Sequence, residues 1–275
     1  MVAERQQAWL QCANYVPQSL NAAACAKMDG MSGVAQAVTL TPSDVVRQAQ
    51  VAQSPNGICY AVMGQANIPS ADLERMVATV PRPVAAALTR KAYYFVPLTV
   101  GQGDDTVIAD RYDVTLSDSA VCHRNLNLGD SHCVFISTRL MDDKFSLAFE
   151  FFINVAHAFV EQAGVPAEFS DLLWKQVQDR QRGETGLDAW EFRKAAHGNF
   201  GDVEKAKNEY FSAAFSDAIA IYMLSTYTDV DYYDLREREY PLLAPNALAE
   251  RLRKIAELFP ANQGFEFNIY YRRRP

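Results

Sequence analysis

Four polar side chains interrupt an otherwise apolar segment of the chain, residues 150–164 (EFFINVAHAFVEQAG). They are Glu150, Asn154, His157 and Glu161. At about 100° per residue they fall at about 0°, 40°, 340° and 20°, which is one narrow stripe of a helix. A helix that is apolar over the rest of its surface is expected to be buried. Because a buried ionised group is costly unless it is paired, hydrogen-bonded or bound to a metal, the stripe needs one common explanation.

Metal binding is one such explanation. His157 and Glu161 are four residues apart, about one helical turn, so both side chains can reach the same point beside the helix. An imidazole and a carboxylate at that spacing can hold a divalent metal, zinc or another ion. A second, largely apolar helix is predicted for residues 202–225; Glu209, Ser212 and Ser216 share one of its faces, and Asp217 lies near this face. If the two helices face each other along their polar stripes, they enclose a small polar site with Glu209 as the third ligand.

A purely structural reading of each residue stays open. Glu161 could leave the core near the end of its helix, His157 could be a hydrogen-bonded core histidine, and Glu209 could lie in the exposed first half of its helix. His197 could reach the site, or it could interact only with the carbonyls at the end of its own helix. His123 and His132 bracket a predicted hairpin turn and are expected in solvent.

The elements that must position these residues follow from hydrophobic periodicity and from Gly and Pro positions. Strands are predicted at 92–100, 105–116 and 132–138, after two short helices broken by prolines from residue 70. The stripe helix, 143–163, ends at Gly164 and Pro166, and helices follow at 167–181, 187–197, 202–225 and 245–258. Residues 264–271 are expected to form a strand or an arm. Strands that precede helices favour an α+β fold, with a small mixed sheet packed on the stripe helix and a helical subdomain after it.

The N-terminal quarter differs in composition from the rest. Residues 1–66 are predicted to be an Ala-rich helical extension, with helices near 3–14 and 18–28 and a third beginning at Thr41 and Pro42. Residues 67–275 are predicted to form the α+β domain. Cys122 and Cys133 flank the predicted hairpin turn and could form a disulfide or remain two half-buried thiols.

The order of these motifs resembles the core of zincin metallopeptidases. In that family a strand precedes a helix that bears His-Glu-x-x-His, whose histidines bind zinc and whose glutamate activates a water molecule. Here HCVFIST (132–138) precedes the helix of His157, and EYFSAAF (209–215) is similar to the helix that supplies a glutamate ligand in gluzincins, particularly in lethal-factor-like bacterial toxins. The segment MVATVPRPVAAALTRKAYYFVPL (76–98) resembles the lead-in to this core. The resemblance covers about residues 70–230, and it implies a zincin-like fold and a bacterial setting.

The motif itself is degenerate. The sequence HAFVE keeps His157 as the first ligand but has Ala158 where the family has its catalytic glutamate, and Glu161 where it has the second histidine. An alanine cannot take a proton from water, so that route to hydrolysis is closed. Glu161 could still bind a metal, but two carboxylates and one imidazole would favour a harder ion than zinc.

Three interpretations follow. The first is a metallopeptidase-like domain that has lost its hydrolytic activity, needs no cofactor, and binds or regulates a protein or peptide partner. The second is an active metal-dependent hydrolase with a rearranged site, in which the metal ligands are His157, Glu161 and Glu209. In that case the proton would be handled by Glu150, Asp217 or His197. The third is an α+β protein whose likeness to zincins is due to chance, with partner binding through the N-terminal helices.

Composition excludes some classes of function. The 275 residues carry a net charge of −7, which argues against general nucleic-acid binding. No apolar run is long enough to span a bilayer, and the first residues lack the layout of a signal peptide. We therefore expect a cytoplasmic location, or secretion as an effector without a visible signal peptide.

Overall fold

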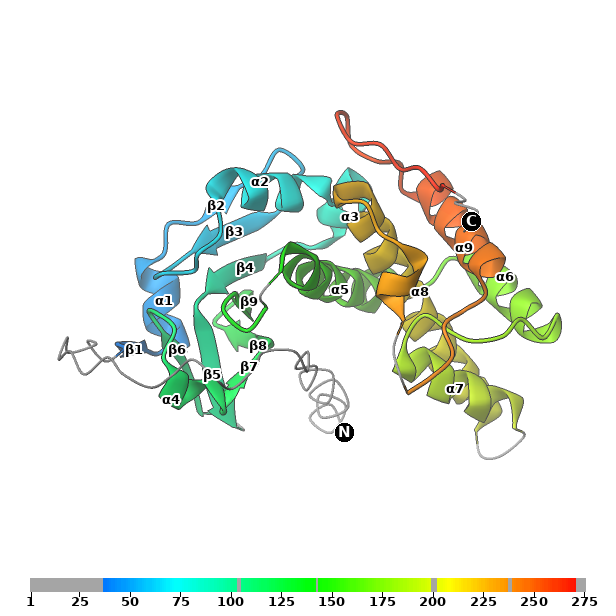
Figure 1. The fold of residues 1–275 in the computed structure, drawn as a ribbon, viewed down its shortest axis with the longest axis horizontal. Coiled ribbons are helices and arrows are strands. Elements are labelled where there is room, and N and C mark those ends of the chain that lie inside the picture. Colours follow the sequence, from blue (N-terminus) through cyan, green and yellow to red (C-terminus); the bar gives the residue numbers. More distant parts are fainter. Residues whose placement is uncertain (1–36, 103–104, 142, 199–201, 237–238, 271–275) are drawn as a thin grey trace, which may run out of the picture.

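The computed structural model describes residues 37–102, 105–141, 143–198, 202–236 and 239–270 (Figure 1). The predicted helices at 3–14 and 18–28 lie outside this part of the chain. Within it, the fold is α+β, as predicted, with two sheets on one side and a group of helices on the other. Helix α5 (Lys144–Ala163) lies between the two parts in Figure 1.

The larger sheet is mixed and has the strand order β2-β3-β4-β9-β8. Its members are β2 (Ala52–Gln53), β3 (Cys59–Val62), β4 (Lys91–Val96), β9 (Ser131–Ser137) and β8 (His123–Leu128). Strands β3, β4 and β9 are parallel, whereas β2 and β8 are antiparallel to their neighbours and form the two edges. Residues 93–96 of β4 and 133–137 of β9 are all buried, as expected for central parallel strands that are covered on both faces.

The smaller sheet has the order β1-β6-β5-β7 and is antiparallel throughout. Its strands are β1 (Thr39–Leu40), β6 (Asp105–Ala109), β5 (Leu98–Gln102) and β7 (Ala120–Val121). The strand predicted at 92–100 is therefore two strands in different sheets, separated at Pro97, because proline cannot donate a ladder hydrogen bond. The strand predicted at 105–116 ends at Ala109, and a short helix, α4 (Val114–Ser117), follows a cap by Asp113.

Three helices precede or connect the first strands of the sheets. The N-terminal cap of α1 (Pro42–Gln48) is Thr41, as predicted, and Thr41 and Asp44 form a reciprocal capping box. Helices α2 (Ser70–Thr79) and α3 (Arg82–Ala87) are separated by Pro81 and connect β3 to β4. The described part of residues 1–66 thus contributes strands to both sheets as well as α1, while a domain boundary at residue 66 stays a prediction.

Helix α5 follows β9 and has the predicted bounds. The side chain of Asp143 accepts a hydrogen bond from the Ser146 amide at its start, and Gly164, with φ of 72°, ends it. The helix packs on the larger sheet through its aromatic residues, and the rings of Tyr93 and Phe151 meet edge to face at 5.0 Å.

The remaining helices form the second part of the fold. They are α6 (Ala167–Gln178), α7 (Leu187–His197), α8 (Val203–Tyr227), the short 3₁₀ helix η3 (Tyr232–Leu235) and α9 (Pro245–Leu258). Helix α8 contacts α5 on one side and α7 on another, and its residues 214–224 are all buried. Residues 264–270 form no strand and continue as an arm, with Phe267 against the ring of Tyr222 at 4.9 Å. In the described residues, no helix has both the length and the hydropathy needed to cross a bilayer.

Candidate functional site

The polar stripe of α5 lies at the surface along half of its length. We call its four residues, Glu150, Asn154, His157 and Glu161, the α5 row. Asn154 is 6% exposed and Glu150 is half-buried, but His157 and Glu161 are exposed. The expectation that the whole stripe is buried was therefore wrong. The C-terminal half of the row is thus the exposed face of a helix whose other faces pack in the core.

The N-terminal end of the α5 row, Glu150, contacts a residue of the edge strand β8. The Nδ1 atom of His123 lies 2.5 Å from Oε1 of Glu150, and Nδ2 of Asn154 donates to the same oxygen at 3.2 Å. Asn154 also donates to the main-chain oxygen of Glu150 at 2.8 Å. The expectation that His123 lies in solvent was wrong, because it begins a strand rather than a turn. His132, which contacts Asn127, is exposed as expected.

His157, one turn further along α5, lies in an electrostatic environment set by several elements. Although the residue is exposed, desolvation by the surrounding atoms lowers the pKa of its imidazole below the ordinary value, and His123 acts in the same direction. Asp188, at the start of α7, is the strongest influence that raises this pKa, followed by Glu150 and Glu161. Desolvation dominates, so His157 is neutral at neutral pH.

The C-terminal end of the α5 row, Glu161, lies near the beginning of β4. Burial lowers the pKa of Lys91, the first residue of that strand, and the negative charge of Glu161 opposes this effect. Glu161 itself is exposed. The row therefore runs from a histidine of β8 to a lysine of β4, across the surface of α5.

The polar residues of α8 do not form a matching row. Ser212 is exposed and donates to the Asn208 carbonyl at 3.0 Å, while the buried Ser216 donates to the Ser212 carbonyl at 2.9 Å. Both hydroxyls are thus satisfied within their own helix. Glu209 is half-buried in the first half of α8. In the ranges that the structure describes, no three or more His, Cys, Asp or Glu side chains are grouped so that they could hold a metal ion. A metal site of His157, Glu161 and Glu209 stays a prediction.

Two other residues that were considered for the site lie elsewhere. His197 is exposed at the last residue of α7. It lies about 14 Å along that helix from Asp188, at a rise of about 1.5 Å per residue. Asp217 belongs to a different group of polar residues, described next.

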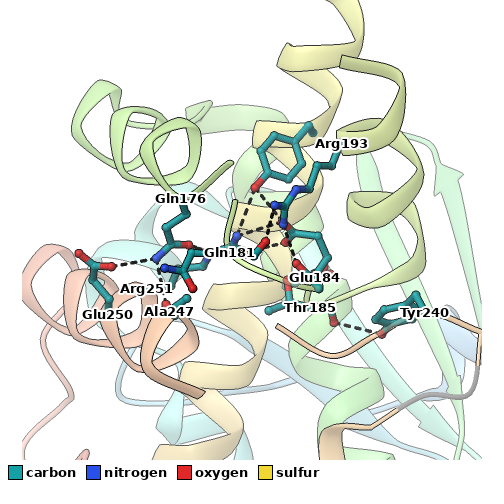
Figure 2. A network of polar contacts seen from close by, with 12 residues as sticks. Gln176, Gln181, Glu184, Thr185, Arg193, Tyr240, Ala247, Glu250 and Arg251 are labelled. Carbon is teal, nitrogen blue, oxygen red and sulfur yellow. Dashed lines mark hydrogen bonds and ion pairs between the residues drawn. The ribbon is translucent and has the colours of Figure 1, made fainter. Parts of the chain in front are cut away.

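A buried network of ion pairs and hydrogen bonds joins the helices of the second part (Figure 2). Its centre is Glu184, a residue of the loop before α7 that is 0% exposed. Arg251 of α9, Arg193 of α7 and Tyr210 of α8 all donate to its carboxylate. Gln176 of α6 accepts a hydrogen bond from Arg251 Nε at 2.8 Å. One carboxylate therefore ties three helices to the loop, and Arg251 connects the fourth, α6, through Gln176. We call this group the Glu184 network.

Asp217 lies beside the Glu184 network on α8 and is 4% exposed. Its Oδ2 atom accepts a hydrogen bond from the hydroxyl of Thr185 at 3.1 Å. A Cβ atom at Gly186 would come within 2.4 Å of the same oxygen, so this position has no room for a side chain. Burial raises the pKa of Asp217 to about 7, and the nearby charges of Glu184 and Asp188 add to this effect.

None of the described cysteines, Cys59, Cys122 and Cys133, forms a disulfide with another of them. Leu126 is the residue of β8 opposite Cys133, and the main chain of Cys122 bonds to Ser137, four residues further along. Cys122 and Cys133 are thus not paired across the hairpin. Of the two outcomes that the sequence left open, the structure has two thiols, one half-buried and one buried.

The chain shows no significant match to any known protein family, curated protein or solved structure. The likeness to zincins therefore rests on the motifs quoted above.

Proposed function

We propose that this chain is a metallopeptidase-like domain without hydrolytic activity, which binds an extended peptide segment of a partner protein along the α5 row. The observation that carries the proposal is the contact between His123 and Glu150. Glu150, the only carboxylate in the N-terminal half of the row, already has two protein partners, His123 and Asn154. It is therefore not available to activate water. At the motif position of the catalytic glutamate stands Ala158, which is 4% exposed and packed in the core.

The arrangement of elements supports the metallopeptidase-like part of the proposal. Strand β9 leads directly into α5, and α8, the helix of Glu209, packs against α5. Upstream, α2 and α3 are separated by a proline and lead into β4. This is the order of elements on which the sequence resemblance was based. This order supports the proposal of a metallopeptidase-like domain in which the hydrolytic residues of the family are replaced or already have protein partners.

The binding part of the proposal is supported by the surface next to the row. Strand β8 is an edge strand, with a neighbour on one side only among the described strands. The main-chain groups of an edge strand can pair with an extended peptide, and side chains beside the edge then select its sequence. The α5 row leads from this edge across the helix to the exposed Glu161, so a peptide that continues along the row is favoured if it carries Lys or Arg there.

Selection of peptides from a random display library tests this role. We expect enriched basic sequences on the wild-type protein, with binding weakened at least about tenfold by Glu161→Lys, a loss of about 1.4 kcal/mol. Glu74→Lys makes the same charge change at an exposed position of α2, away from the row, and should leave the affinity unchanged. If no sequence is enriched over beads without protein, or if both variants behave alike, the binding role is wrong.

One observation favours the alternative, an active metal-dependent hydrolase with a rearranged site. The charges of Asp188, Glu150 and Glu161 all raise the pKa of His157, so three carboxylates lie within electrostatic range of this imidazole, although in the described residues they are not grouped closely enough to hold a metal ion. Elemental analysis separates the two functions. Near-stoichiometric metal that is lost in Glu161→Ala, together with peptide cleavage that is abolished by His157→Ala, would establish the hydrolase and overturn the non-hydrolytic domain.

A further inference from the structure

A cavity of about 240 Å³ lies at the carboxyl ends of the parallel strands. Its walls come from residues 67–69 after β3, from the beginning of α2, from residues 138, 139 and 141 after β9, from the first turns of α5, and from Tyr227 at the end of α8. No residue of the α5 row lines it. In open sheets with parallel strands, ligands commonly bind outside the carboxyl ends of the strands. The cavity thus occupies a favourable place in the fold for a second site, independent of the function proposed above.

The inner wall of the cavity is apolar. Leu73 and Met76 of α2 are each 2% exposed, and Leu147 of α5 is 9% exposed. Ile68, Met141 and Tyr227 complete the apolar lining. Ligand pockets in proteins usually have volumes of about 300–1,000 Å³, so a cavity of about 240 Å³ suits a ligand smaller than a drug molecule. Such a ligand would bury an apolar body against these side chains.

Among the described residues, the charges of the cavity leave one cation without an acidic partner. Lys144 is paired with Asp72 at 2.6 Å, and Asp143 accepts hydrogen bonds from the amide and the hydroxyl of Ser146. The guanidinium of Arg139 lies 5.7 Å from the centre of the Tyr112 ring and forms no ion pair with any residue in the described ranges. Asp72 is therefore neutralised by Lys144, and Asp143 is held by the first turn of α5, whereas the guanidinium of Arg139 can bind an anion.

We propose that this cavity binds a small carboxylic acid in its ionised form. Its carboxylate would pair with Arg139, and its short aliphatic or aromatic body would pack against Leu73, Met76 and Leu147. Arginine suits this role because its planar guanidinium offers two parallel N–H donors to a carboxylate. The ring of Tyr112 supports the guanidinium from one side.

Ligand-observed NMR with the full chain tests the proposal. The probes are butyrate, hexanoate, benzoate and 3-phenylpropionate, each paired with its neutral amide. We expect at least one acid to bind about tenfold or more tightly than its amide, and the advantage to disappear in Arg139→Gln. Lys175→Gln removes the same charge from an exposed position of α6 that does not line the cavity, and the preference should persist there.

A measurement on the wild-type protein alone locates the bound acid. With methyl-labelled protein, the signals of Leu73, Met76 and Leu147 should shift on addition of the acid, while those of Leu252 in α9 should not. The proposal is overturned if none of the four acids binds, if acids and amides bind equally, or if the shifted methyl groups lie outside the cavity. A preference for acids that survives Arg139→Gln would also overturn it.

Discussion

Arg251 and Glu184 form a two-point ion pair that protein encloses on all sides. Nη1 of Arg251 lies 2.7 Å from Oε2 of Glu184, and its Nη2 lies 3.1 Å from Oε1. Both side chains are 0% exposed. Arg193 and Tyr210 donate to the same carboxylate at 2.9 and 2.8 Å. Two guanidinium groups thus share one fully buried acid, which makes Glu184 the centre of charge balance among the helices.

This sharing predicts unequal effects for the partners of the pair. Glu184→Gln removes the acid that two cations share and leaves only Asp217 nearby, whereas Arg251→Met leaves Glu184 still paired with Arg193. Breaking a buried ion pair by removing one partner costs about 3–5 kcal/mol, so we expect both variants to be strongly destabilised. Glu184→Gln should be the worse of the two in urea unfolding. Lys254→Met, a control on the same helix in a partly exposed ion pair, should lose at most about 1 kcal/mol.

Asp217 should make the protein less stable as pH rises, the opposite of the usual effect of a carboxylate that is stabilised in its ionised form. Its pKa is raised from 3.8 to about 7 in the folded state. Between these values the folded state holds a proton that the unfolded chain has released, so the free energy of unfolding falls as pH rises. The full difference of about three pKa units corresponds to about 4 kcal/mol as an upper limit.

The variant Asp217→Asn isolates this contribution because the amide has no proton to release in this range. The free energy of unfolding of the variant, minus that of the wild type, should increase from pH 4 to pH 8. Asp171→Asn, at an exposed position of α6, should show no such increase. A difference between wild type and Asp217→Asn that does not change with pH would mean that Asp217 is ionised in the folded protein throughout.

Most helices could be predicted from the sequence because their ends carry local signals. Asp143 caps α5 and Gly164 ends it, and Pro245 begins α9, so periodicity and end signals agreed. Short strands lack such signals. Strand β3 has only four residues, and β8 was hidden in a segment read as a turn. The break at Pro97 was not recognised, because the apolar run continues through it.

Of the candidate site, the sequence could predict only which residues share a face of one helix. The spacing of Glu150, Asn154, His157 and Glu161 shows that they share a face, but periodicity does not tell whether that face meets solvent. Glu184 could not be found at all. It stands in a charged loop that resembles a solvated one, and its partner Arg251 is 67 residues away. Long-range pairing of this kind leaves no local signal in a single sequence.

The contact between His123 and Glu150 should fix β8 against α5. Their side chains are 27% and 19% exposed, so the pair is partly screened by solvent. A double-mutant cycle with His123→Ala and Glu150→Ala, measured by urea unfolding, should give a coupling energy of about 0.5–1 kcal/mol. The control is the contact between His132 and Asn127 on the same hairpin, which is exposed and should couple less. A coupling energy near zero in the first cycle would show that this contact adds nothing to the attachment of β8.

Restoring the motif glutamate should damage the protein rather than activate it. Ala158 is 4% exposed within the main core, so the carboxylate of Ala158→Glu would be buried without a partner in the described structure. We expect a loss of about 3 kcal/mol or more in the free energy of unfolding at pH 7.

The loss should shrink as pH falls towards 5, because burial raises the pKa of the new carboxyl and a protonated acid is cheaper to bury. Gln162→Glu, at an exposed position of the same helix, is the matched control and should change stability by less than about 0.5 kcal/mol. A stable Ala158→Glu protein that cleaves peptides in the presence of zinc would instead show that position 158 faces a functional metal centre.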